Sequence, residues 1–95
     1  MRDYELVVII NPAVSDENLP KTIEKISQFI TSKGGEIVEV AQWGRKKLVY
    51  PIKRLMEGNY VLTRFKSDAK LVKELEANLK LTEEVVRHLV VRSEA

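Results

Sequence analysis

Ninety-five residues are enough for one hydrophobic core but not for two, so we expect a single domain over residues 1–95. With no cysteine and one histidine, the chain excludes disulfide bonds, thiolate chemistry and a metal site built from several histidines. The net charge is only +2, yet the segment Trp43–Arg54 contains five cations and no acid. This local basic segment predicts contact with an anion.

The N-terminal part of the chain predicts a strand followed by a helix. Residues 4–10 are largely apolar on both alternating faces, which is typical of a central strand, and Asn11-Pro12 ends it. The apolar run is too short for a membrane span and lacks the cleavage site of a signal peptide, so a cytosolic protein is expected. Ser15 is the expected N-cap of a helix over about 16–33, which Gly34-Gly35 ends.

The middle of the chain predicts one long hairpin. A strand over 36–43 is interrupted by Gly44, as in a β-bulge, and strand character then resumes as far as Ile52. A turn around Gly58, which we expect to supply an unusual backbone dihedral, leads to a strand over 60–66.

The C-terminal part repeats the helix and strand pattern. Ser67 or Asp68 is the expected cap of a second helix, whose apolar residues from Leu71 to Leu79 form one stripe, and residues 84–92 form the last strand. The order β-α-β-β-α-β predicts a ferredoxin-like split β-α-β fold of the α+β class. In this plan two helices cover one face of a four-stranded antiparallel sheet, and strands one and three lie in the middle.

The second face of that sheet is expected to remain open. Val7 and Ile9, together with Leu89 and Val91, are predicted to lie there beside Arg87. Such a face is typical of a docking surface, but single apolar residues on a solvated sheet are also common. Composition alone leaves both interpretations open.

Enzymatic chemistry finds little support in the sequence. No glycine-rich phosphate loop is present, and His88 has no carboxylate or hydroxyl nearby in the sequence that could make it a general base. The acidic pairs Asp16-Glu17 and Glu83-Glu84 lie at element boundaries, where helix capping and solvation explain them. We therefore expect no catalytic residue, no cofactor and no metal.

The basic segment Trp43–Arg54 is the most informative part of the chain. In one interpretation, the lysines of this edge strand do no more than prevent aggregation, and that interpretation stays open. Arginines beside Trp43 and Tyr50 suit phosphates and RNA bases better, because guanidinium groups form forked hydrogen bonds and stack on rings. The chemistry therefore favours RNA binding.

Several stretches resemble one protein family. They are Tyr4-Glu5, Pro12 after the first strand, WGRKKLVYPIKR, the GNY that ends at Tyr60, and VVRHLVVR. Over nearly its whole length the chain resembles the bacterial small-subunit ribosomal protein S6 family. The resemblance implies the ferredoxin-like fold, a place on the cytoplasmic ribosome, and binding to the central domain of the small-subunit ribosomal RNA as a heterodimer with ribosomal protein S18.

The resemblance also implies which residues make contact. The expected RNA-binding residues are Arg2, Tyr4, Arg45, Lys46, Lys47, Tyr50, Lys53, Arg54 and Arg87. The expected partner-binding residues are Trp43, Leu89 and Val91. A ferredoxin-like regulatory module that binds a ligand or associates with itself through the open face is the alternative.

Overall fold

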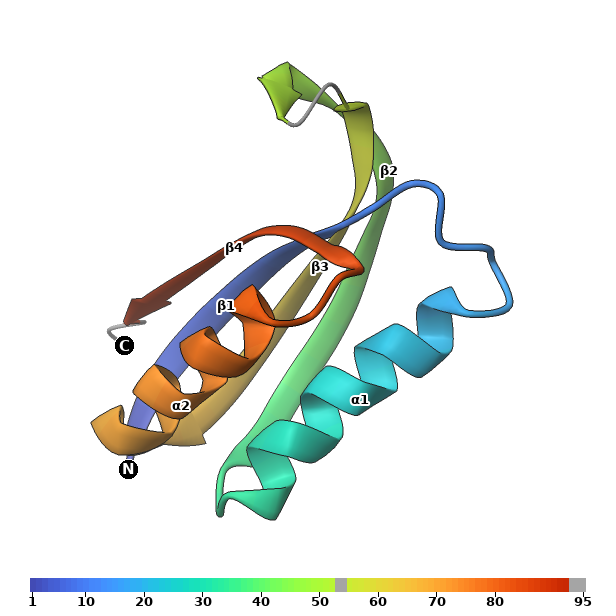
Figure 1. Ribbon diagram of the computed structural model, residues 1–95. Coiled ribbons are helices and arrows are strands. Elements are labelled where there is room, and N and C mark those ends of the chain that lie inside the picture. The colour runs from blue at the N-terminus through green and yellow to red at the C-terminus, as the bar shows by residue number, and fades with distance from the viewer. Residues whose placement is uncertain (53–54, 93–95) are drawn as a thin grey trace.

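The fold is a four-stranded antiparallel sheet covered on one face by two helices (Figure 1). The computed structural model describes the backbone of residues 1–52 and 55–92, and the side chains of residues 1–44 and 58–92. The elements are β1 (Arg2–Ile10), α1 (Leu19–Ser32), β2 (Glu36–Ile52), β3 (Leu55–Ser67), α2 (Ala69–Lys80) and β4 (Val85–Arg92). The strand order β2-β3-β1-β4 places β1 and β3 in the middle, so the predicted ferredoxin-like topology is confirmed.

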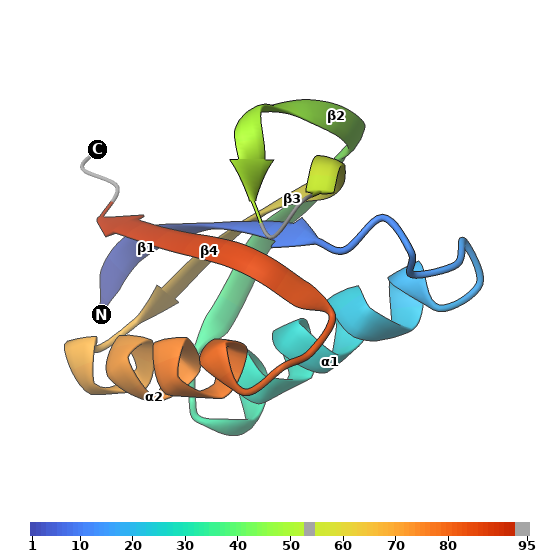
Figure 2. The same cartoon turned by 45° about the horizontal axis from the view of Figure 1, so that its top comes forward.

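The core lies between the sheet and the helices. Leu6, Val8 and Ile10 of β1 point toward the helices and are fully buried, because alternate residues of a strand share one face. On the helices, apolar side chains at spacings of three and four form the opposing stripe, which includes Ile30 and Leu75. Figure 2 shows both helices on the same side of the sheet, and the end of the β2–β3 hairpin rising on the other side.

The two helices begin differently. The Asp68 side chain accepts a 2.8 Å hydrogen bond from the backbone N–H of Leu71, so Asp68 rather than Ser67 caps α2. The prediction that Ser15 caps α1 is wrong, since the helix begins after Asn18. The hydroxyl of Ser15 accepts a 3.2 Å hydrogen bond from the backbone N–H of Asn18, and so closes a turn directly before the helix.

The β2–β3 hairpin spans the predicted part of the chain, but its second strand begins earlier than predicted. Gly44 has a φ of +82°, and the pairing register shifts between Gln42 and Gly44, which confirms the predicted bulge. The predicted turn around Gly58 is wrong, because β3 already begins at Leu55 and Gly58 pairs with Lys46. Propensity favoured a turn here because the segment contains Gly58 and Asn59, but pairing with β2 keeps it extended.

Space, and not an unusual dihedral, explains why residue 58 is glycine. A Cβ atom built on Gly58 would lie closer to Cγ2 of Ile9 than real Cβ contacts come. The branched side chain of Ile9 is stiff at its first torsion and cannot easily turn away. The central strand β1 and the hairpin can therefore approach only because this position has no side chain.

We expect Gly58→Ala to lower the free energy of unfolding by about 1–3 kcal/mol, the usual cost of overpacking. Urea denaturation followed by circular dichroism measures this change. The same substitution in an Ile9→Ala background should cost much less, because Cγ2 is then missing. An equal loss in both backgrounds would contradict the steric explanation.

Candidate binding surface

The open face of the sheet has charged residues at one end. Each cation of β3 stands opposite one acid on β1 and another on β2, so acids outnumber cations two to one. The two rows, called here the acidic rows, are Asp3–Lys66–Glu36 and Glu5–Arg64–Glu39. Nε of Arg64 lies 3.4 Å from Oε1 of Glu5 and 3.5 Å from Oε1 of Glu39. One guanidinium is therefore shared by two carboxylates from two different strands.

The next row along the strands contains only apolar side chains. It runs across all four strands and is called here the apolar row: Leu89–Val7–Leu62–Ala41. Leu62 is buried, whereas Leu89 at the β4 edge is 55% exposed. A shallow cavity of about 270 Å³ opens beside this row, lined by Val7, Ile9, Tyr60, Arg87, His88 and Leu89. Apolar side chains at the sheet surface can thus receive an apolar group.

The opposite end of the face leads to the basic hairpin. Arg87 stands opposite Ile9, in the row after the apolar row. The last residue pair between β1 and β3 is Ile10 with Asn59, so the hairpin continues beyond this point with two strands only. We call residues 45–52 and 55–58 the hairpin arm; they extend past the four-stranded sheet (Figure 1). The cations Arg45, Lys46 and Lys47 of the basic segment belong to the arm, and Lys53 and Arg54 connect its two strands in the sequence.

The structure brings some of the predicted contact residues together. Leu89 and Val91 are exposed on the open face, with Arg87 on the same strand, and Trp43 is exposed at the bulge that precedes the arm. Arg2 is exposed at the start of β1, far along the strand from the arm. The side chains of Arg45, Lys46, Lys47 and Tyr50, and all of Lys53 and Arg54, lie outside the described residues.

Tyr4 does not lie on the surface that was expected to meet RNA. Its ring faces the helices, is 8% exposed, and stacks on Phe65 with ring centroids 5.6 Å apart. Tyr4 alternates with Glu5, and only Glu5 points to the open face. The tyrosine is therefore a core residue, and we do not include it among the residues proposed to bind RNA.

Sequence reasoning missed the acidic rows and did not place Tyr60 beside the cavity of the open face. Both follow from the register, which sets Arg64 opposite Glu5 and Glu39, and Tyr60 opposite Ile9. Alternation within each strand could have shown which residues share a face. The pairing of one strand with the next, however, depends on the hairpin's bulges and length.

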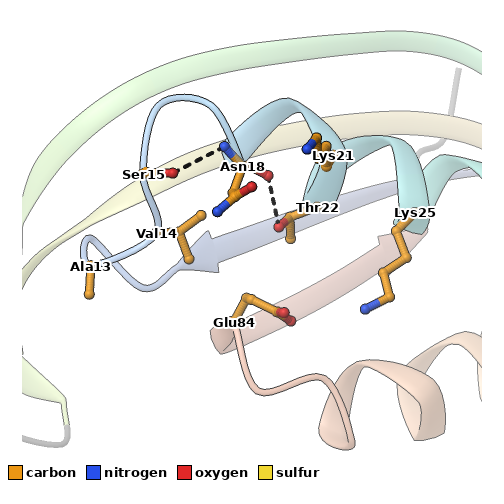
Figure 3. A pocket seen from close by; sticks show the side chains of 8 residues that line it. All are labelled: Ala13, Val14, Ser15, Asn18, Lys21, Thr22, Lys25 and Glu84. Atoms are coloured by element: carbon orange, nitrogen blue, oxygen red, sulfur yellow. Dashed lines mark hydrogen bonds between the residues drawn. The ribbon is translucent and has the colours of Figure 1, made fainter.

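A second cavity, of about 350 Å³, lies where α1 begins. Figure 3 shows Lys25 of α1 and Glu84, just before β4, extending toward the same space. The hydroxyl of Thr22 donates a 3.2 Å bond to the backbone oxygen of Asn18. The polar groups here thus close the helix entry, and their mixed charge favours no particular ligand.

The part of the chain that the structure describes offers neither a metal-binding cluster nor a membrane-spanning helix. No group of three or more histidine, aspartate or glutamate side chains there could hold a metal ion. No helix there is long and apolar enough to cross a membrane.

The fold defines a ferredoxin-like domain of the α+β class, whose open sheet face presents charged and apolar residues in separate rows. The chain belongs to the ribosomal protein S6 family, whose model, described as "Ribosomal protein S6", matches residues 3–92. This is a family of structural proteins of the small ribosomal subunit.

Individual relatives agree with this assignment. The chain is 40% identical to small ribosomal subunit protein bS6 of Moorella thermoacetica, over 99% of this chain and 96% of that protein. It is 44% identical to bS6 of Clostridioides difficile, over 96% of this chain and 98% of that protein. The crystal structure of ribosomal protein S6 from Thermotoga maritima superposes with a TM-score of 0.92 at 32% identity, covering 97% of this chain and 87% of that chain.

The fold also occurs outside this family. The C-terminal domain of the MgtC protein from Mycobacterium tuberculosis matches with a TM-score of 0.69 but only 13% identity, over 99% of this chain and 89% of that chain. This likeness concerns the fold alone.

We expect Tyr4→Ala to lower the free energy of unfolding by about 3–5 kcal/mol, as for other large aromatic residues removed from a core. Tyr4→Phe keeps the ring on Phe65 and should retain most of the stability. Arg2→Ala, an exposed neighbour on the same face, should change stability by about 0.5 kcal/mol or less. Urea denaturation measures all three, and a wild-type value for Tyr4→Ala would contradict a core role.

Proposed function

We propose that this chain, as a single domain over residues 1–95, binds the central domain of the small-subunit ribosomal RNA together with ribosomal protein S18. The binding would occur during assembly of the small subunit in the cytoplasm, and the chain would act as a structural protein and not as an enzyme. Membership of the ribosomal protein S6 family supports the proposal. The resemblance of the basic segment to the family signature supports the RNA contact in particular.

The observation that carries the proposal is the separation of charge along the open face. The acidic rows occupy one end, and Arg87 and the hairpin arm occupy the other. RNA phosphates are repelled by carboxylates and attracted by lysine and arginine, so RNA is expected to meet only the basic end. The proposed RNA-binding residues at that end are Arg45, Lys46, Lys47, Tyr50, Lys53, Arg54 and Arg87. Arg2 lies at the opposite end of β1, beside the acidic rows, and is not included.

The apolar row supports a protein partner beside the RNA. Leu89 and Val91 are exposed next to a cavity with apolar walls, and such anchor sites usually carry much of the binding energy between proteins. A few phosphate contacts alone would give weak RNA binding. A joint surface with a basic protein raises the number of phosphate contacts, which is a physical reason for a heterodimer.

We expect the double variant Arg54→Ala/Arg87→Ala to weaken binding to a central-domain RNA fragment in the presence of S18, because two cations are lost from the basic end. Filter binding at several salt concentrations should show a salt slope smaller by about two, roughly one per phosphate contact. Lys70→Ala/Lys73→Ala on α2 removes the same charge from exposed positions on the helix side. If the two double variants bind RNA equally well, the proposed RNA surface is wrong.

We expect Leu89→Gln to weaken binding to purified S18 by roughly tenfold, because an apolar anchor is lost from the edge of the cavity. The control is Leu81→Gln at the end of α2, where the leucine is 84% exposed and away from the sheet. Isothermal titration calorimetry compares the two. A symmetric dimer of this chain that excludes S18 would instead favour the self-associating module.

A further inference from the structure

The acidic rows carry a net negative charge. Their six side chains sum to −2, because two carboxylates from different strands flank each cation. Nε of Arg64 lies within 3.5 Å of a carboxylate oxygen of Glu5 and of one of Glu39, so two acids share one cation. The Glu5 side chain is only 28% exposed, so solvent screens it less than a fully exposed acid.

This negative end is continuous with the apolar row. Glu5 and Val7 are two residues apart on β1, which corresponds to about 7 Å along a strand. Val91 of β4 stands opposite Glu5 of the acidic rows, and Leu89 of β4 stands opposite Val7 of the apolar row. The exposed edge of β4 is therefore apolar beside the Glu5 row as well as in the apolar row. A single extended segment laid along the sheet could therefore contact the carboxylates and the apolar row at the same time.

We propose that the acidic rows bind a cationic segment of the protein partner, a proposal that rests on the function proposed above. A lysine or arginine of that segment approaches the Glu5 and Glu39 carboxylates, and an aliphatic side chain about 7 Å away enters the cavity beside Val7 and Leu89. Charge complementarity fixes this occupant, because a polyanion or an acidic partner would be repelled.

The proposal assigns a direction to the complex. The basic part of the partner lies at the end where β1 begins, and the RNA lies at the end where the hairpin arm projects. The acidic rows then act on specificity and association rate more than on affinity, as charged residues around an apolar contact generally do. This role belongs to the four carboxylates of the rows, which repel RNA phosphates.

The test compares two charge reversals of equal size, Glu39→Lys in the acidic rows and Glu24→Lys on α1. Glu24 is exposed on the helix side and bonds only within its own helix, to Gln28, among the contacts described. The Glu39→Lys substitution leaves Glu5 in place as a partner for Arg64, and circular dichroism checks the fold of the variant. Binding to purified S18 and to central-domain RNA is measured separately for wild type and both variants, at about 50 mM and about 500 mM salt, since screening is much stronger at the higher concentration.

The expected result is that Glu39→Lys weakens S18 binding roughly fivefold at the lower salt, with a smaller effect at the higher salt. Its RNA binding should stay the same or become tighter, and Glu24→Lys should leave S18 binding unchanged. Equal S18 binding by both variants, with the wild type binding normally, would overturn this proposal alone. A wild-type protein that does not bind S18 at all would overturn the proposed function together with it.

Discussion

The whole molecule depends on one constraint: two helices can cover only one face of a four-stranded sheet. β1 meets this constraint by being apolar on both faces, with Leu6, Val8 and Ile10 under the helices and Val7 and Ile9 on the other side. Its position in the centre of the sheet removes its backbone from water. The core on the helix side therefore stabilises the sheet, and the side chains of the uncovered face are available for contacts with other molecules.

The open face divides into three zones because the strand register places residues of β1, β2 and β3 with matching chemistry in the same row. Where β3 presents Arg64 and Lys66, its neighbours present acids; where it presents Leu62, they present Val7 and Ala41. Oppositely charged side chains across strands stabilise a sheet modestly, and apolar cross-strand pairs do the same. The same pairs that hold the sheet together thus sort its surface into acidic, apolar and basic zones.

The sequence predicted the fold well because its signals were local. The apolar run of residues 4–10, the helical spacing in the two helices and the glycine at the bulge each had one consistent interpretation. The predicted turn around Gly58 was wrong. The glycine is needed because Ile9, more than forty positions away in the sequence, leaves no room for a side chain there. Tyr4 was misplaced for a similar reason: its resemblance to a family motif said nothing about which side of β1 it occupies. The acidic rows needed the strand register, which propensity does not supply.

The alternation of charge and apolar groups on β3 also bears on how the chain avoids misfolding. Arg64 and Phe65 are neighbours that point to opposite sides, one into solvent between two acids and the other into the core. A slip of β3 by one residue would drive the guanidinium under the helices and expose the phenyl ring. A one-residue error of alignment is thereby penalised twice, once by burying a charge and once by exposing an aromatic ring to water.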